Sequence, residues 1–290
     1  MRLLVPYPDN RTGYWNQETT GIGSERVITM ITSTSNSQMK TIVQLNKKTK
    51  TRRQLGVFVV EGIRMFREVP REWLGQIYVS EHFLEDAGHQ QELEGFSYEI
   101  VSDQVFRAVS DTQTPQGILC LVKQPVYTLD DLLAGEHTHL LILEDIQDPG
   151  NLGTMVRTGE GAGATGIIMS KNTVDLFNPK TIRSTMGSIY RMPYYVSEDL
   201  SETISFLKKK GIQTYAAHLK GTQSYDQPDY TGPTAFLIGN EGNGLSDAIA
   251  EQADTYIRIP MEGKVESLNA SIAATLLMYE VNRQRRINTK

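Results

Sequence analysis

Residues able to orient a hydroxyl group and stabilise a developing negative charge occur in three parts of the chain. Each part lies where a predicted strand gives way to a loop or a helix. The residues are Asn151, Arg157, Glu241, Ser267 and Asn269. Amides and hydroxyls bind polar ligands, and a guanidinium stabilises negative charge without titrating. Each residue also has an ordinary structural interpretation, as a helix cap, an exposed turn residue or a surface cation.

A glycine-rich turn is the strongest local signal for a ligand site. Residues 238–246 read Ile-Gly-Asn-Glu-Gly-Asn-Gly-Leu-Ser and follow a predicted strand. A second strand, predicted at 256–260, leads through the tripeptide 267–269 into the last helix. Ligands of open α/β sheets bind at the carboxyl ends of the strands. Glycine at position 239 would let the backbone approach a ligand closely.

A second glycine pattern, Gly161-Ala-Gly-Ala-Thr-Gly166, matches the dinucleotide-binding fingerprint but stands in the wrong place. In that fingerprint the glycines follow a strand and open a helix, so that pyrophosphate binds at the helix N-terminus. Here they close the predicted helix 152–162 and lead into the strand 166–169. We interpret them as a helix cap with tight helix–strand packing, and a nicotinamide dehydrogenase is the last of the functional alternatives.

The elements that must position these groups alternate between strand and helix. In the C-terminal half the predicted strands are 140–143, 166–169, 192–196, 213–217, 234–238 and 256–260. The predicted helices are 152–162, 178–186, 200–210 and 268–284. This alternation is typical of a mostly parallel sheet with helices on both faces. Along the last helix one apolar face is shared by Leu268, Ile272, Leu276 and Tyr279.

A smaller α/β domain is predicted in front of this sheet. Its predicted elements are a helix over 35–45 capped by Ser35 or Asn36, strands at 56–60, 76–79, 98–101 and 117–122, and a helix from Glu61 that Pro70 must end or kink. The basic stretch 47–53 is predicted to be a loop or a frayed helix end. We expect a flexible extension at 1–32, a small α/β domain at 33–123, a linker at 124–138 and a second domain at 139–290.

The charge of the chain is unevenly distributed. The 290 residues carry a formal net charge of −5, which argues against a uniformly basic nucleic-acid binder. Residues 36–75 nevertheless hold nine basic against three acidic residues. Such a segment can bind phosphates, and its alternative is a solvated helix face. The candidate RNA-binding residues are Lys40, Lys48, Lys50, Arg52 and Arg53.

Cysteine and histidine usage predicts neither a disulfide nor a metal site. The single cysteine, Cys120, lies in an apolar strand and is expected to be buried. His137 and His139 stand at the end of the predicted linker without a cluster of further ligands, so we expect them to be solvated. No apolar run approaches the roughly 18–20 residues that span a bilayer, and the N-terminus does not read as a signal peptide. We expect a cytoplasmic protein.

Three segments carry a resemblance to a known family. Residues 148–158, 238–246 and 259–274 resemble, in order and spacing, the signature motifs of the SpoU (TrmH) RNA ribose 2′-O-methyltransferases of the SPOUT superfamily. Residues 175–187 resemble the intervening segment. Residues 33–123 resemble, more loosely, the RNA 2′-O-ribose methyltransferase substrate-binding domain that precedes the catalytic domain in ribosomal-RNA members.

The resemblance implies a fold, a cofactor and an assembly. The fold would be an α/β parallel sheet with helices on both faces and a deep trefoil knot at its C-terminal end, in a homodimer. The cofactor would be S-adenosylmethionine, held in the knot largely by backbone. The residues that this carries over to this chain are Gly239, Asn240, Ile259, Met261, Leu268 and Ala270.

The resemblance also implies roles for the five polar residues. The family's motif-one arginine, here Arg157, is usually assigned to activating the 2′-hydroxyl. Because a free guanidinium is a poor base, we expect Arg157 to stabilise the developing alkoxide or the adjacent phosphate. We expect Glu241 to orient Arg157 or Asn151 through charge-assisted hydrogen bonds, with base catalysis as a second role. Asn151 would hold the ribose or phosphate, and Ser267 and Asn269 the catalytic loop and target nucleotide.

The expected reaction is methyl transfer from S-adenosylmethionine to a ribose 2′-hydroxyl of RNA. The first domain favours 23S ribosomal RNA as the substrate, because small transfer-RNA members of the family mostly lack that domain. Two further alternatives stay open, a transfer-RNA methyltransferase and a non-catalytic RNA-binding relative. A methylase that confers resistance to a ribosome-targeting antibiotic would be a narrower version of the ribosomal function.

Overall fold

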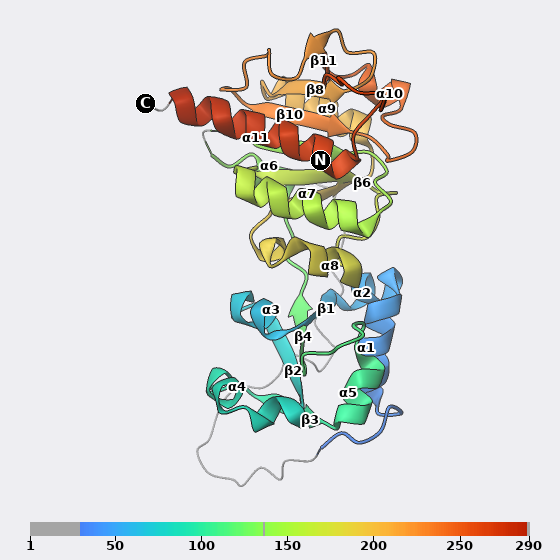
Figure 1. The fold of residues 1–290 in the computed structure, drawn as a ribbon, viewed down its shortest axis with the longest axis vertical. Coiled ribbons are helices and arrows are strands. Elements are labelled where there is room, and N and C mark those ends of the chain that lie inside the picture. Colours follow the sequence, from blue (N-terminus) through green and yellow to red (C-terminus); the bar gives the residue numbers. More distant parts are fainter. Residues whose placement is uncertain (1–29, 136, 289–290) are drawn as a thin grey trace, which may run out of the picture. The chain divides into compact units, whose positions relative to one another are not determined.

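The computed structural model of the chain describes residues 30–135 and 137–288. Contacts between Cα atoms divide the chain into two compact units, with the division between Gln124 and Pro125 (Figure 1). The predicted flexible extension falls outside the described residues up to position 29. Ile31, which the prediction placed in that extension, pairs with Val101 and is buried. The first domain therefore includes residues before position 33.

The first unit contains a four-stranded mixed sheet in the order β1-β4-β2-β3. Its strands are β1 (Val57–Glu61), β2 (Leu74–Ser80), β3 (Tyr98–Val101) and β4 (Ile118–Lys123). Its helices are α1 (Ser37–Lys47), α2 (Thr49–Leu55), α3 (Ile63–Glu68), the 3₁₀ helix η1 (His82–Glu85), α4 (Ala87–Glu92) and α5 (Asp103–Val109). Only the β2–β3 pair is parallel, and β1–β4 and β2–β4 are antiparallel.

The predicted helix cap and helix end of this unit are confirmed. Asn36 caps α1, because its side chain accepts from the N–H groups of Gln38 and Met39. Helix α3 ends at Glu68, and Val69 takes an extended conformation before Pro70, as the proline ring requires. Cys120 is buried in β4, which raises the pKa of its thiol and leaves it a core residue.

Two predictions for the basic stretch are wrong. Residues 49–55 form the helix α2 instead of a loop. Arg52, predicted to bind RNA, is 2% exposed. Its guanidinium donates to the carbonyl oxygens of Leu45 and Asn46. It also donates to the Thr49 hydroxyl at a distance of 3.0 Å. Arg52 thus satisfies carbonyls at the C-terminal end of α1, which lack partners within the helix.

The second unit contains a seven-stranded sheet in the order β7-β6-β5-β10-β8-β11-β9. Its strands are β5 (His139–Leu143), β6 (Gly166–Ser170), β7 (Tyr194–Ser197), β8 (Gln213–Ala217), β9 (Gln223–Ser224), β10 (Thr234–Ile238) and β11 (Thr255–Arg258). All neighbouring strands pair in parallel, which confirms the predicted parallel sheet. The carboxyl ends of the strands therefore meet at one edge.

Helices cover both faces of this sheet (Figure 1). They are α6 (Leu129–Leu132), α7 (Pro149–Ala162), α8 (Pro179–Thr185), the 3₁₀ helix η2 (Ser188–Tyr190), α9 (Leu200–Lys209), α10 (Asp247–Ala250) and α11 (Ala270–Asn288). Helices α6, α9 and α10 share one core cluster with Leu140, Ile142 and Leu237. On the opposite face α7 packs against both α8 and α11. The segment 124–138 carries α6, whose Leu132 is buried in that cluster.

Helix α7 carries the start of the first signature motif. Asp148 accepts from the N–H of Asn151 and caps the helix, and Pro149 occupies its first turn. Gly163, with φ of +81°, ends it in a left-handed cap. The glycine pattern 161–166 is therefore a helix end leading into β6, as predicted.

Two expectations about the second unit differ from the structure. His139 is 1% exposed in β5 instead of solvated, and burial together with the nearby Arg285 lowers its pKa to about 3. The apolar face predicted on the last helix exists, but Ile272 (49%), Leu276 (36%) and Tyr279 (46%) are exposed. The side chains of α11 that face the core belong to another stripe, which includes Ala274, Leu277 and Val281. No described helix is long and apolar enough to cross a membrane.

Candidate functional site

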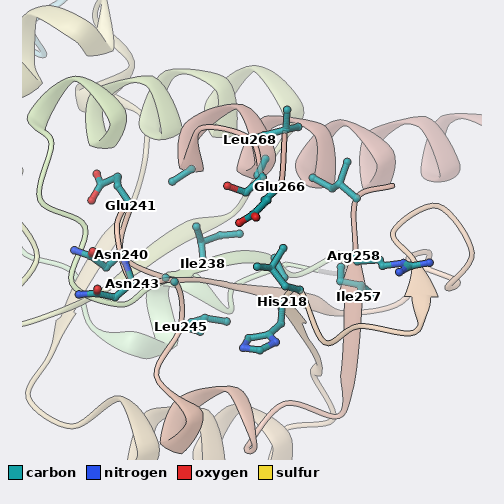
Figure 2. A pocket seen from close by; sticks show the side chains of 18 of the residues that line it. His218, Ile238, Asn240, Glu241, Asn243, Leu245, Ile257, Arg258, Glu266 and Leu268 are labelled. Carbon is teal, nitrogen blue, oxygen red and sulfur yellow. Dashed lines mark hydrogen bonds between the residues drawn. The ribbon is translucent and has the colours of Figure 1, made fainter. Parts of the chain in front are cut away.

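A pocket opens where β8, β10 and β11 end at the carboxyl edge of the seven-stranded sheet (Figure 2). It encloses about 290 Å³. Three stretches far apart in sequence line it: residues 217–219, the turn 238–245, and the segment from Ile257 to the first turns of α11. The glycine turn and the residues Ser267 and Leu268 of the third motif thus meet in one cavity.

The glycine turn folds tightly against itself at Gly239. A Cβ atom at this position would lie 2.0 Å from the backbone nitrogen of Leu245, so only glycine fits. The side chain of Asn240 closes the turn, since its Oδ1 accepts from the N–H groups of Gly242 (2.8 Å) and Asn243 (3.1 Å). The N–H of Gly244 donates a 2.8 Å hydrogen bond to the Asn240 carbonyl and completes the turn. The turn therefore presents a fixed backbone surface to the pocket.

All six residues predicted to bind a cofactor line this cavity. They are Gly239, Asn240, Ile259, Met261, Leu268 and Ala270. Apolar walls from Ile238, Ile257 and Leu277 enclose the polar turn. A volume of about 290 Å³ lies near the lower end of the range for small-molecule sites, and apolar walls with a few convergent polar groups are typical of them. The residues present fit a nucleoside-sized ligand.

On the wall of the pocket, Glu241 joins the glycine turn to the first signature motif. One carboxylate oxygen of Glu241 accepts 3.0 Å hydrogen bonds from Asn151 Nδ2 and from Asp148 N–H, and the other accepts from Gln147 N–H at 3.0 Å. Partial burial raises the pKa of Glu241, but these hydrogen bonds outweigh it and hold the pKa below its ordinary value. Glu241 is therefore ionised at neutral pH and is an anchor for Asn151.

Asn151 is held from its other side by the third signature motif. Its Oδ1 accepts from Asn269 Nδ2 at 3.0 Å and from the Ser271 hydroxyl at 3.3 Å. Asn269 in turn caps α11, because its Oδ1 accepts from Ser271 N–H at 2.9 Å. With both ends of its amide engaged, Asn151 has a fixed orientation. The network joins all three motifs through Glu241, Asn151 and Asn269.

Ser267 and Arg157 stand outside this network. Ser267 is exposed and lines the pocket. Arg157 lies on the exposed side of α7, outside the set of described residues that line the pocket. Six residues along an α-helix turn the side chain through about 600°, so Arg157 points about 120° away from Asn151. In the described part of the chain, Glu241 orients Asn151 and not Arg157, which decides between the two partners that the sequence left open.

Two residues that line the pocket were missed by the sequence analysis. His218 directly follows β8, and the same rule of ligand binding at strand ends would have found it. Glu266 precedes Ser267, and its carboxylate points into the pocket (Figure 2). In the first unit, four of the five predicted RNA-binding residues are exposed on α1, on α2 or between them: Lys40, Lys48, Lys50 and Arg53.

Comparison with known proteins matches each unit to a family model. The model of the SpoU rRNA Methylase family matches residues 138–279, and the model of the MRM3-like substrate binding domain matches residues 36–120. Among curated proteins, the chain is 33% identical over 253 residues to the 23S rRNA (guanosine(2553)-2'-O)-methyltransferase RlmP of Bacillus subtilis. That alignment covers 87% of this chain and 98% of the relative.

Two solved structures are similar to this chain over most of its length. An AdoMet-bound rRNA methyltransferase from Sinorhizobium meliloti superposes with a TM-score of 0.77 at 30% identity, over 88% of this chain and 97% of that chain. The SpoU methyltransferase AviRb from Streptomyces viridochromogenes, in complex with AdoMet, gives a TM-score of 0.80 at 26% identity. That match covers 87% of this chain and 98% of AviRb.

Proposed function

Because the chain belongs to the SpoU rRNA methylase family, we propose that it methylates a ribose 2′-hydroxyl of 23S ribosomal RNA. It is an S-adenosylmethionine-dependent RNA ribose 2′-O-methyltransferase. The observation that carries the proposal is the position of Glu241, which lines the cofactor-sized pocket and also holds Asn151. A cofactor in the pocket and a ribose at Asn151 would then be neighbours.

The chain's own residues account for cofactor binding. Backbone groups of the turn at Gly239 and of Ile259 and Leu268 would hold the adenosine part, with Ile238 and Ile257 as apolar walls. When bound, S-adenosylmethionine supplies a methyl group already activated by its sulfonium. The protein must therefore orient the acceptor hydroxyl, exclude water and manage one proton. Orientation of this kind contributes about 7–11 kcal/mol in well-aligned reactions.

Asn151 is the residue best placed to orient the acceptor nucleotide. Its amide is fixed between Glu241 and Asn269 before any RNA is present. Preorganised polar groups stabilise charge without reorganising during the reaction. Ser267, exposed on the pocket wall, would contact the target nucleotide. Glu241 accepts hydrogen bonds from three donors that hold it in place, so we assign it to anchoring Asn151, with base catalysis as its secondary role.

Arg157 would act across a homodimer. Within one chain it lies on the exposed side of α7, which packs against α11. The neighbouring α11 exposes an apolar stripe of Ile272, Leu276 and Tyr279. A second copy covering this stripe would bury apolar area that is otherwise in water and would approach Arg157. We infer that Arg157 of the partner subunit completes each site and stabilises the developing alkoxide.

The trefoil knot is also part of the proposal. Strand β11 lies beyond β8 in the sheet, whereas α11, which follows β11 in the chain, packs against α7 and β10. The connecting residues 259–269 therefore cross the strand-end edge, and several of them line the pocket formed by the turn 238–245. A chain passing behind that turn would form the knot that the family resemblance implies.

The first unit would bring ribosomal RNA to the pocket. Its exposed cations Lys40, Lys48, Lys50 and Arg53 lie along neighbouring helices, where they can contact successive phosphates. The family model of a substrate-binding domain covers the same residues. A substrate of this kind would place the protein in the cytoplasm, which the sequence also predicts.

Mapping of ribose methylation tests the proposed substrate. Ribosomal and transfer RNA from cells with and without the gene are compared for 2′-O-methyl groups by resistance to alkaline cleavage. We expect one 23S ribosomal RNA nucleotide to lose its methyl group when the gene is deleted and to regain it with the wild-type gene. Loss from transfer RNA alone would overturn the ribosomal substrate, and no loss from any RNA would overturn the function in cells.

A further inference from the structure

Asp145 has an unusual backbone conformation beside the pocket. It follows β5 and has a φ of +53°, in the left-handed region. Only one other non-glycine residue in the described ranges, Met186, has positive φ. Side chains with a Cβ are disfavoured in this region, although aspartate tolerates it better than most. Residues held in such conformations cluster at functional sites, where the surrounding structure maintains them.

Ser170, at the end of the neighbouring strand β6, holds Asp145 in this conformation. The hydroxyl of Ser170 accepts from Asp145 N–H at 2.9 Å and donates to Asp145 Oδ1 at 2.6 Å. Ser170 is 8% exposed, and its hydroxyl lies 3.0 Å from that of Thr173. Two hydrogen bonds to one residue fix both its backbone and its side chain, so the left-handed conformation is determined by the end of β6.

The carbonyl of Asp145 is directed at the glycine turn. Its oxygen accepts from Asn240 Nδ2 at 2.8 Å and from Gln147 Nε2 at 3.0 Å. The Oδ1 of Asn240 accepts from Gly242 and Asn243 and closes the turn. The side-chain amide of Asn240 therefore contacts the turn through its oxygen and Asp145 through its nitrogen, and so links the two. Figure 2 shows Asn240 at the side of the pocket next to Glu241.

We propose that Asp145 is a positioning residue for the cofactor pocket, whose left-handed backbone, fixed by Ser170, aims its carbonyl at Asn240 and so shapes the turn before the cofactor binds. The inference rests on the proposed S-adenosylmethionine site. Asp145 lies outside the residues that line the pocket, so it acts through Asn240 and not by contact with the ligand. A preformed turn strengthens binding because less ordering remains to be done.

Three variants of the full chain test this inference by calorimetric titration with S-adenosylmethionine and S-adenosylhomocysteine. Asp145→Ala penalises positive φ and removes the bond to the Ser170 hydroxyl, so Kd should rise roughly tenfold for both ligands. Asp145→Gly keeps the carbonyl and accepts positive φ freely, so Kd should stay within about threefold of wild type. Asn240→Asp keeps the acceptor that closes the turn but removes the donor to Asp145, and Kd should again rise roughly tenfold.

The double variant Asp145→Ala with Asn240→Asp separates positioning from general damage. If both changes break the same contact between Asp145 and Asn240, their effects should not add. The Kd of the double variant should then equal, to within about twofold, the higher Kd of the two single variants. Equal loss in the alanine and glycine variants, unchanged binding in Asn240→Asp, or additive losses would each overturn the positioning role. Should Asp145→Ala not fold, Asn240→Asp and Asp145→Gly decide the question. A wild-type chain that binds neither ligand would overturn the proposed function itself.

Discussion

The carboxylate of Glu241 and the side-chain amide of Asn151 are joined by a hydrogen bond of 3.0 Å, although 90 residues separate them in the chain. Glu241 belongs to the wall of the pocket, and Asn151 belongs to the helix α7 beside it. The bond therefore connects the side of the site that fits a cofactor with the side that fits a nucleotide.

Replacement of Glu241 by glutamine should slow catalysis more than it weakens cofactor binding. A neutral amide loses the charge in all three hydrogen bonds that hold Asn151 and the preceding loop. We expect kcat to fall roughly tenfold to a hundredfold, as is typical for lost charge-assisted hydrogen bonds, with Kd for S-adenosylmethionine within about threefold. Steady-state kinetics and calorimetry measure the two quantities. Glu262→Gln, at another exposed carboxylate, is the control, and equal rates in both variants would contradict the role of Glu241.

A methyl group added at Gly239 should close the pocket. The new Cβ would lie 2.0 Å from Leu245 N, and backbone atoms cannot move aside as a flexible side chain can. We expect Gly239→Ala to raise Kd for S-adenosylmethionine by at least about tenfold in a calorimetric titration. Gly242→Ala is the matched control, because its nearest atom is 3.4 Å away. If Gly239→Ala binds as tightly as Gly242→Ala, the turn is not the cofactor wall.

A charge on the exposed stripe of α11 should separate the dimer. Ile272→Asp and Leu276→Asp place a carboxylate where apolar area would be buried between copies. Sedimentation should show a dimer for the wild type and a monomer for these variants, with unchanged circular dichroism. Val126→Asp, at a valine that is 65% exposed, should remain dimeric. A wild-type monomer, or a dimer unaffected by the stripe variants, would exclude this interface.

Mixed dimers should show whether Arg157 acts on its own chain or on the partner. Arg157→Ala alone should lose on the order of a hundredfold in kcat, as expected for a lost electrostatic donor. Asn269→Ala should also be impaired, because Asn151 loses a hydrogen bond of 3.0 Å. If Arg157 completes the partner's site, an equimolar mixture forms heterodimers with one intact site and recovers about a quarter of wild-type activity. No recovery after subunit exchange would place Arg157 in its own chain's site.

The basic residues of the first unit should divide into two functional groups. Lys50→Ala and Arg53→Ala should each lower the salt dependence of RNA binding by about one phosphate contact, with thermal stability unchanged. Arg52→Ala should instead lower the midpoint of thermal unfolding by roughly 4–8 °C, because buried carbonyls of α1 lose their donor. Filter binding over a salt series and calorimetric melting measure the two effects. An Arg52→Ala variant with normal melting and weakened RNA binding would contradict the assignment.

The order of strands and helices was predictable because its signals are local. Asn36 and Asn178 precede helices that they cap, and Gly163 ends α7 with a positive φ that glycine adopts freely. Because ligands bind at strand ends, the sequence predicted that the glycine turn and the third motif would form one site. In the structure, residues 238–245 and residues of the third motif line the same pocket.

Features that depend on distant contacts were not predictable in the same way. Arg52 is a residue type that often binds phosphates, but its guanidinium donates to a backbone carbonyl at the end of α1. His139 follows a polar segment in the sequence, but it is buried because β5 lies between β6 and β10 in the sheet. The angle between Asn151 and Arg157 follows from helix geometry alone, whereas the positive φ of Asp145 becomes visible only with Ser170 beside it.

Transfer of a labelled methyl group in vitro tests the central claim most directly. The purified chain is incubated with S-adenosylmethionine carrying a deuterated methyl group and with 23S ribosomal RNA that lacks its modifications, and the nucleosides are analysed by mass spectrometry. The label should appear on the ribose of one nucleotide with the wild type and, at S-adenosylmethionine below the wild-type Kd, should appear at least about tenfold more slowly with Gly239→Ala. Label on a base, or transfer at the wild-type rate in Gly239→Ala, would contradict methylation of a ribose 2′-oxygen from this pocket.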